Sequence, residues 1–163
     1  MKTWNGYMRG INLGGWISQC PREQSHYDSF ITEKDIQAIA SWGLDHVRLP
    51  IDNDVVSDEE GRFTEGIKYV DHCIEWCRDN GLNIILDLHK APGYAFYDPN
   101  STLFEDAHVQ DTFINLWREF AARYGGSSDF VSFELLNEVA DAESSLWNSL
   151  VRRVICEIRE TAP

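Results

Sequence analysis

Positive charge and long apolar runs are scarce in this 163-residue sequence, and each scarcity excludes a class of protein. Only 14 Lys and Arg stand against 27 Asp and Glu, which gives a net charge of −13. Because phosphate backbones and anionic headgroups repel such a chain, neither nucleic acid nor a membrane surface is expected as a partner. No run of 18 apolar residues exists, and the first ten residues lack the basic-then-apolar pattern of a signal peptide. We therefore expect a soluble chain without an export signal.

Cysteine is also sparse, and its spacing is not that of a metal site. The four cysteines are Cys20, Cys73, Cys77 and Cys156, and none forms a CxxC pair. Cys73 and Cys77 lie four apart in a helical stretch whose neighbourhood supplies no further ligands. The sequence predicts ordinary reduced, mostly buried thiols, and neither a metal nor another cofactor.

Apolar strands alternate with amphipathic helical periods along the whole chain, and 43% apolar residues suffice for one core. Strands are expected at Tyr7 to Asn12, Asp45 to Leu49 (with Pro50 ending it), Asn83 to His89 and Phe130 to Leu136. Helices are expected at about 32–43, 66–80, 109–124 and 143–160. Such alternation predicts an α/β fold with a parallel sheet. A closed eight-stranded barrel on this plan needs about twice this length, so the sequence predicts a (β/α)8-type half-barrel of four βα units, a single domain over 1–163.

Helix ends and apolar stripes can be read from the sequence. Thr32 and Asp35 form a variant of the capping box, while Gly43 and Gly81 supply left-handed stops. The last helix has an expected inner stripe of Leu146, Leu150, Val154 and Ile158.

Polar side chains occur at the end of each expected strand. They are Asn12, Arg48, His89 and the pair Asn137 and Glu138. In a parallel sheet these ends converge on one mouth, which is the usual place of an α/β active site.

Each of these residues also has a structural interpretation. Arg48 alone is equally well explained by pairing with a buried acid, such as Asp87 or Glu134. A lone histidine such as His89 more often has a structural role than a catalytic one. The case for function therefore depends on the residues acting together.

Together, these side chains suit glycoside hydrolysis. A glutamate that neighbouring side chains partly shield from water can donate a proton to a leaving oxygen near neutral pH. An adjacent asparagine can bind a sugar hydroxyl, and aromatic faces can stack on sugar rings. The candidates for stacking are Trp16, Tyr94, Phe96, Tyr97 and Phe104.

Four motifs in order carry a resemblance to a known family. They are RGINLGGW (9–16), VRLP (47–50), LDLHKAPG (86–93) and FELLNE (133–138). In this order they resemble the N-terminal half of glycoside hydrolase family 5, the cellulase family of (β/α)8 barrels. The stretches GINLGGWISQ, FITEKDI, DHVRLP, STLFED and FELLNEV are similar to bacterial endoglucanases of that family that act on β-1,4- and mixed-linkage β-glucans.

The resemblance implies a role for each matching residue. Glu138 matches the general acid/base, and Asn137 matches the residue that binds the sugar 2-hydroxyl in subsite −1. His89 matches a histidine that lines this subsite, and Arg48 matches the arginine that orients the nucleophile. The expected ligand is a β-glucan oligosaccharide or polysaccharide.

Other positions match the family less closely. Trp16 and Tyr94 are expected in the cleft. Val139 stands where most members have proline, although similar endoglucanases share the valine, and Lys90 stands at a variable position. The family is usually extracellular.

One essential group has no counterpart in the sequence. Retaining members need two carboxylates about 5–5.5 Å apart, and the family takes its nucleophilic glutamate from the seventh strand. Asp87 and Glu134 lie deeper in their strands, where we expect them to pair with Arg48. The chain ends at Pro163, where a fifth strand is expected to begin. It therefore supplies the acid/base half of the site, and its own turnover is expected to be very slow.

Two interpretations follow, with a weaker third. The chain is either a segment of a retaining endo-β-glucanase that needs a complementary C-terminal half-barrel, or a non-catalytic half-barrel that self-associates or binds carbohydrate. Two unpaired edges and an apolar inner face are expected to make it a homo-oligomer or to recruit a partner. A metal-dependent barrel that uses His89 and Glu138 lacks a third ligand.

Overall fold

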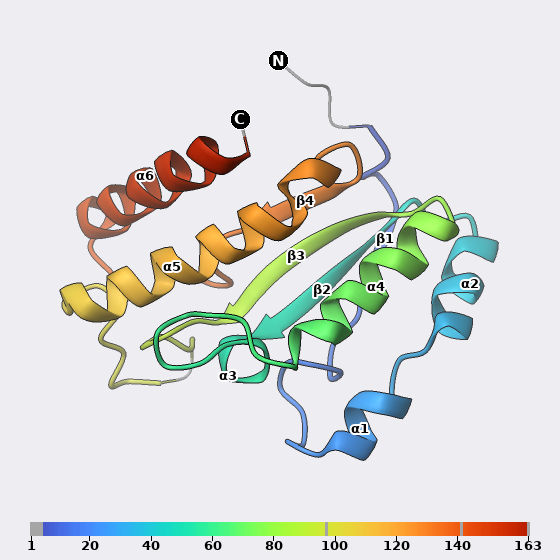
Figure 1. Cartoon of the computed structure of the whole chain (residues 1–163), viewed down its shortest axis with the longest axis horizontal. Helices are drawn as coiled ribbons and strands as arrows, with labels where there is room; N and C mark the ends of the chain where they lie inside the picture. Colours follow the sequence, from blue (N-terminus) through green and yellow to red (C-terminus); the bar gives the residue numbers. More distant parts are fainter. Residues whose placement is uncertain (1–4, 97, 141, 163) are drawn as a thin grey trace.

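A parallel four-stranded sheet forms the centre of the computed structural model, which describes residues 5–96, 98–140 and 142–162. The strands are β1 (Gly10–Asn12), β2 (His46–Asp52), β3 (Asn83–Lys90) and β4 (Val131–Glu134), and they lie in the order of the sequence. In Figure 1 the arrowheads of β2 and β3 point to the same edge of the sheet. The predicted α/β half-barrel with parallel strands is confirmed.

The helices are α1 (Gln24–Ser29), α2 (Glu33–Ser41), α3 (Asn53–Val56), α4 (Ile67–Asp79), α5 (Ala107–Tyr124) and α6 (Ser144–Thr161), with a 3-10 turn, η1 (Gly125–Ser127), before β4. The four long helices lie where the sequence predicts them. The short helices α1 and α3 lie in segments for which the sequence analysis predicts neither a strand nor a helix. Helix α1 buries none of its residues, so its sequence needs no apolar stripe from which the helix could be predicted.

The strands differ from prediction at their ends. The prediction that Pro50 ends β2 is wrong, because the strand continues to Asp52. The carbonyl of Arg48 accepts from Leu13 and the amide of Asp52 donates to Ile17, so both residues direct their backbone polar groups toward the β1 side. Backbone groups alternate between the two sides of a strand, so those of Pro50, midway between these residues, point to the β1 side too. The β1 ladder ends at the Asn12–Arg48 pair, so the missing amide of Pro50 breaks no ladder bond.

The outer strands β1 and β4 are shorter than predicted because side chains bind the backbone groups at their ends. The amides of Met8 and Arg9 donate to the Asp45 carboxylate rather than to a neighbouring strand. The carbonyl of Leu135 accepts from the Trp117 indole at 3.2 Å, beyond the end of β4. Side chains thus take over the backbone groups at the strand ends.

The predicted helix ends are largely confirmed. Thr32 and Asp35 form a capping box at the start of α2, and Gly43 and Gly81 adopt φ of +77° and +69° after α2 and α4. On α6, Leu150 and Val154 are buried as predicted, but Leu146 is 43% exposed. Leu146 lies in the first turn and faces an open hollow beside the loop after β3, so its place in the inner stripe is wrong.

The two faces of the sheet differ in character. In Figure 1, α4 and α5 run across the front of the sheet. The side chains of Val47, Leu49, Ile84 and Leu86 alternate onto one face, are fully buried and belong to the same core cluster as residues of α4 and α5. The strand residues that alternate onto the other face are mostly polar: His46, Arg48, Asp52, Asn83, Asp87, Ser132 and Glu134. The expectation of an apolar inner face is therefore wrong, since this face carries the ion pairs of the mouth.

The cysteines are less buried than predicted. Cys73 and Cys77 are buried in α4, whereas Cys20 is half-buried and Cys156 is exposed. A hydrogen bond with Cys77, together with burial, raises the pKa of Cys73. Within the described ranges, no three His, Cys, Asp or Glu side chains gather into a metal site. None of the helices in those ranges is long and apolar enough to cross a membrane.

Candidate functional site

The guanidinium of Arg48 joins the ends of all four strands. Its Nε and Nη2 donate to the two carboxylate oxygens of Glu134 at 2.7 and 2.8 Å, and Nη2 lies 2.8 Å from Oδ2 of Asp87. Nη1 donates to Asn12 at 3.0 Å and Nη2 to the amide oxygen of Asn137 at 2.9 Å. The bond with Glu134 is the largest cause of the raised pKa of Arg48. The pairing expected with Asp87 and Glu134 is confirmed, and the same arginine also binds Asn137.

A buried carboxylate orients His89. Oδ2 of Asp87 lies 2.9 Å from Nδ1 of His89, and Asp87 is fully buried. Because a carboxylate accepts, Nδ1 of a neutral His89 carries the proton in this arrangement, which leaves Nε2 as the acceptor. The other oxygen of Asp87, Oδ1, has no hydrogen-bond partner among the described residues. Burial raises the pKa of Asp87, and the opposing effects of His89 and Arg48 are smaller.

This raised pKa predicts how stability depends on pH. The folded chain holds the Asp87 proton more tightly than the unfolded chain, so the free energy of unfolding contributed by this group falls as pH rises above the ordinary value of 3.8 toward the raised one. Replacing Asp87 with asparagine is expected to flatten that fall. Urea titrations at several pH values from about 3 to 7 measure it, and an unchanged slope in the variant would contradict the assignment.

The chain turns sharply after β4, at Asn137 and Glu138. The backbone amide of Asn137 donates to Leu88 of β3 at 3.1 Å, and its side chain is buried against Arg48. Glu138 follows with φ of +46°, in the left-handed region, and is exposed. The sheet thus places Asn137 inside the mouth and Glu138 at its rim.

The two aromatic residues predicted in the cleft, Trp16 and Tyr94, are buried and form hydrogen bonds within the protein. Trp16 is 1% exposed, its indole donates to Tyr27 at 2.8 Å, and its ring stacks on Trp76 with centroids 6.0 Å apart. Tyr94 is 4% exposed, and its hydroxyl contacts the backbone around Glu138. Contact of either residue with a sugar stays a prediction.

Other aromatic side chains border a hollow between the loop after β3 and the start of α6. Phe96 and Phe104, from the loop after β3, line a hollow of about 480 Å³ together with Leu146. Phe96 is exposed, and Phe104 packs edge-on against Tyr94. Tyr97, the remaining stacking candidate of this loop, lies outside the described residues.

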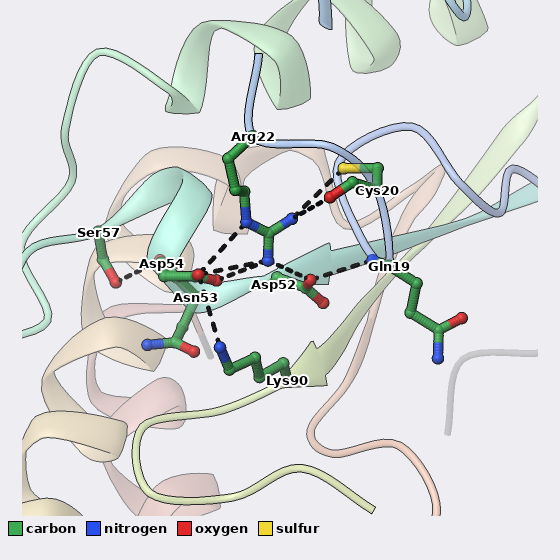
Figure 2. A network of polar contacts seen from close by, with 8 residues as sticks. All are labelled: Gln19, Cys20, Arg22, Asp52, Asn53, Asp54, Ser57 and Lys90. Carbon is green, nitrogen blue, oxygen red and sulfur yellow. Dashed lines mark hydrogen bonds and ion pairs between the residues drawn. The ribbon is translucent and has the colours of Figure 1, made fainter. Parts of the chain in front are cut away.

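A second charged cluster, which no sequence motif marks, lies at the rim (Figure 2). Arg22 donates to Asp52 at 2.6 Å and to Asp54 at 3.1 Å, while Lys90 lies 3.5 Å from Asp54. The amide of Gln19 donates to the same Asp52 oxygen at 3.0 Å. These contacts fasten the loop after β1 to the ends of β2 and β3. The only available signal was the number of charges in these loops, which does not specify a pairing.

Removing the Arg22 side chain is expected to release this loop. Replacing Arg22 with methionine leaves the carboxylate of Asp52, which is buried, without its cation, and we expect a loss of about 1–3 kcal/mol in the free energy of unfolding. Limited proteolysis is expected to cut the segment around Gln19 and Cys20 sooner. The matched control is Arg62→Met, whose partners Asp58 and Glu60 are solvent-accessible. Equal effects of the two substitutions would refute the special role of Asp52.

Comparison with known proteins identifies the relatives of this chain. The sequence model described as "Cellulase (glycosyl hydrolase family 5)" matches residues 7–163. Endoglucanase C of Acetivibrio thermocellus is 48% identical over 159 residues, which cover 94% of this chain and 46% of that protein. Cellodextrinase A of Ruminococcus flavefaciens is 45% identical over 162 residues, which cover 97% of this chain and 48% of that protein. The chain therefore spans about half the length of these relatives.

In solved structures too, the matched part is about half of the other chain. Endoglucanase Cel5A from the hyperthermophilic Thermotoga maritima superimposes with a TM-score of 0.77 at 26% identity, over 95% of this chain and 48% of that one. A further glycoside hydrolase superimposes with a TM-score of 0.80 at 26% identity and covers 95% of this chain and 50% of its own. The half-barrel thus matches about half of each complete structure.

Proposed function

Because the chain belongs to the cellulase family, glycosyl hydrolase family 5, we propose that it supplies the acid/base half of a retaining β-glucanase site. The single observation that supports this most is the set of contacts of Arg48, which brings Asn12, Asp87, Glu134 and Asn137 together beside Glu138. A constellation of this kind at the strand ends is what a barrel enzyme uses for catalysis. Its substrate would be a β-glucan.

Each side chain has a task in this proposal. Glu138 protonates the glycosidic oxygen as the bond breaks and then deprotonates the attacking water. The amide oxygen of Asn137 already accepts from Arg48, so its NH₂ group is free to donate to the sugar 2-hydroxyl. His89, held by Asp87, presents Nε2 to the sugar in subsite −1.

The nucleophile would come from outside the described residues. Asp87 and Glu134 both bind Arg48, so neither is available to attack an anomeric carbon. Arg48 would then orient a carboxylate that reaches the mouth from a complementary half-barrel, about 5–5.5 Å from Glu138. In this view residues 1–163 are the N-terminal half of a (β/α)8 catalytic domain, with the complementary half as partner.

The competing proposal is a non-catalytic half-barrel that self-associates or binds carbohydrate. Within the part of the chain that the structure describes, β1 and β4 each pair with one strand only, and this favours it, since strand edges readily pair. A homodimer would bring a second Glu138 to the mouth, but it would not supply a nucleophile in the place that the family uses.

Assays with and without a complementary half separate these proposals. The chain is tested on barley β-glucan and carboxymethylcellulose, alone and mixed with the part of Endoglucanase C that this chain does not match. We expect very slow hydrolysis by the chain alone and a gain of orders of magnitude in the mixture. Rapid hydrolysis by the chain alone would contradict the missing nucleophile, and sedimentation equilibrium would detect a homodimer.

A further inference from the structure

We propose that Tyr94 is a positioning residue, which fixes the conformation of Glu138 through the backbone and does not bind the sugar with its hydroxyl. The inference rests on the proposed function, in which Glu138 is the proton donor. It gives Tyr94 a role different from the cleft contact that the sequence suggested.

The backbone at Glu138 needs support from its surroundings. Its φ of +46° lies in the left-handed region, where a side chain with a Cβ atom is disfavoured. Gln19 is the other residue with a side chain that adopts such a φ in the described ranges. Unusual backbone conformations of this kind persist only where neighbouring contacts hold them.

The Tyr94 hydroxyl supplies those contacts on both sides of the turn. It donates to the carbonyl of Glu138 at 2.7 Å and accepts from the amide of Ala140 at 2.9 Å. The single hydroxyl proton is therefore already used within the protein. A sugar hydroxyl can accept this proton only if the bond between Tyr94 and the carbonyl of Glu138 breaks.

Tyr94 is itself fixed by the turn that follows β3. The backbones of Ala91 and Tyr94 exchange two hydrogen bonds, at 2.9 and 3.0 Å. Between them Gly93 has φ of +64°, and a Cβ atom there would lie 2.5 Å from Val109. The Tyr94 ring packs edge-on against Phe104, with centroids 5.4 Å apart. The hydroxyl therefore reaches the end of β4 from a rigid support on β3.

The position of a proton donor matters more than its presence. A general acid works only within hydrogen-bond reach of the leaving oxygen, and misplacement by about 1 Å costs on the order of a hundredfold in rate. Asn137 is placed independently, by its own bonds to Leu88 and Arg48. Tyr94 thus sets the place of Glu138 relative to a neighbour that does not depend on it.

The test is Tyr94→Phe, read by nuclear magnetic resonance on the chain itself. Three-bond couplings report φ at Glu138, and hydrogen exchange reports the amides of Ala140 and Asn137. We expect φ at Glu138 to leave the positive region and the amide of Ala140 to exchange about fivefold faster, while the exchange rate of the Asn137 amide changes less than about twofold.

The matched control is Tyr124→Phe, which removes a buried hydroxyl bonded to Asp71. A positive φ that persists in Tyr94→Phe would overturn the proposal, and so would equal loosening of Asn137, which indicates a merely structural role.

A kinetic measurement in the mixture with the complementary half adds a second readout. Tyr94→Phe is expected to lower kcat/KM about tenfold for aryl β-cellobiosides with poor leaving groups, because kcat/KM reports the step in which the glycosidic bond breaks. It is expected to spare kcat/KM for a dinitrophenyl β-cellobioside, whose dinitrophenolate leaves without a proton. An equal fall in kcat/KM for both substrates would overturn the proposal. If the wild-type mixture hydrolyses neither, the proposed function fails, and the couplings at Glu138 still decide the role of Tyr94.

Discussion

Replacing Arg48 with methionine is expected to lower the free energy of unfolding by about 3 kcal/mol, because it leaves a buried carboxylate without its cation. Asp87 is fully buried and 2.8 Å from the guanidinium, and Glu134 loses a two-point contact with the same group. Methionine has a similar length and no charge, so the loss of charge dominates the loss of packing. Urea unfolding followed by circular dichroism measures the effect.

Two further variants control the Arg48 experiment. Arg123→Met breaks a two-point contact with Asp71 of similar geometry on the surface, and it is expected to cost less than about 1 kcal/mol. Adding Asp87→Asn to Arg48→Met removes the stranded charge, so the pair is expected to recover part of the loss. If Arg48→Met were no more costly than Arg123→Met, the buried carboxylate would not depend on this arginine.

Replacing Glu138 with glutamine is expected to reduce β-glucan hydrolysis by about 10²–10⁴-fold in the mixture with the complementary half. Glutamine preserves the size of the side chain but has no proton to donate at neutral pH. Because Glu138 is exposed and binds Tyr94 through its backbone carbonyl, the fold is expected to be unaffected. Initial rates on barley β-glucan, together with thermal unfolding of both proteins, test this.

The control for Glu138 is another exposed glutamate of the same region. Glu143, at the start of α6, has a side chain whose contact with Ser145 is long, at 3.5 Å, so Glu143→Gln is expected to retain the rate. Equal losses in the two variants, or an unchanged rate in Glu138→Gln, would remove Glu138 from the role of proton donor.

Much of the fold was predictable because it is repetitive. Each βα unit shows its own apolar strand and amphipathic helix, and glycines such as Gly43 and Gly81 mark helix ends by a conformation that few other residues adopt. Helix α1 was missed because it buries none of its residues. Pro50 misled the prediction because its effect depends on whether a neighbouring strand needs its amide, which only the sheet shows.

The site was predictable where it follows the strand ends and unpredictable where loops meet. Arg48, His89 and Asn137 lie close together because parallel strands end at one edge. The bond of Tyr94 to Glu138, and that of Arg22 to Asp52, join segments far apart in the sequence. Such pairings leave no periodic pattern, because they depend on how separate loops fold over the sheet.

The polar face of the sheet has a consequence for the order of events during synthesis. A sheet whose open side carried apolar side chains would have to be covered as soon as it formed, or it would aggregate. Here that side carries charged groups already paired with each other, such as Arg48 with Asp87 and Glu134, and the outer strands β1 and β4 are short. The four βα units are therefore expected to fold as they leave the ribosome without the aggregation that an open apolar face would cause.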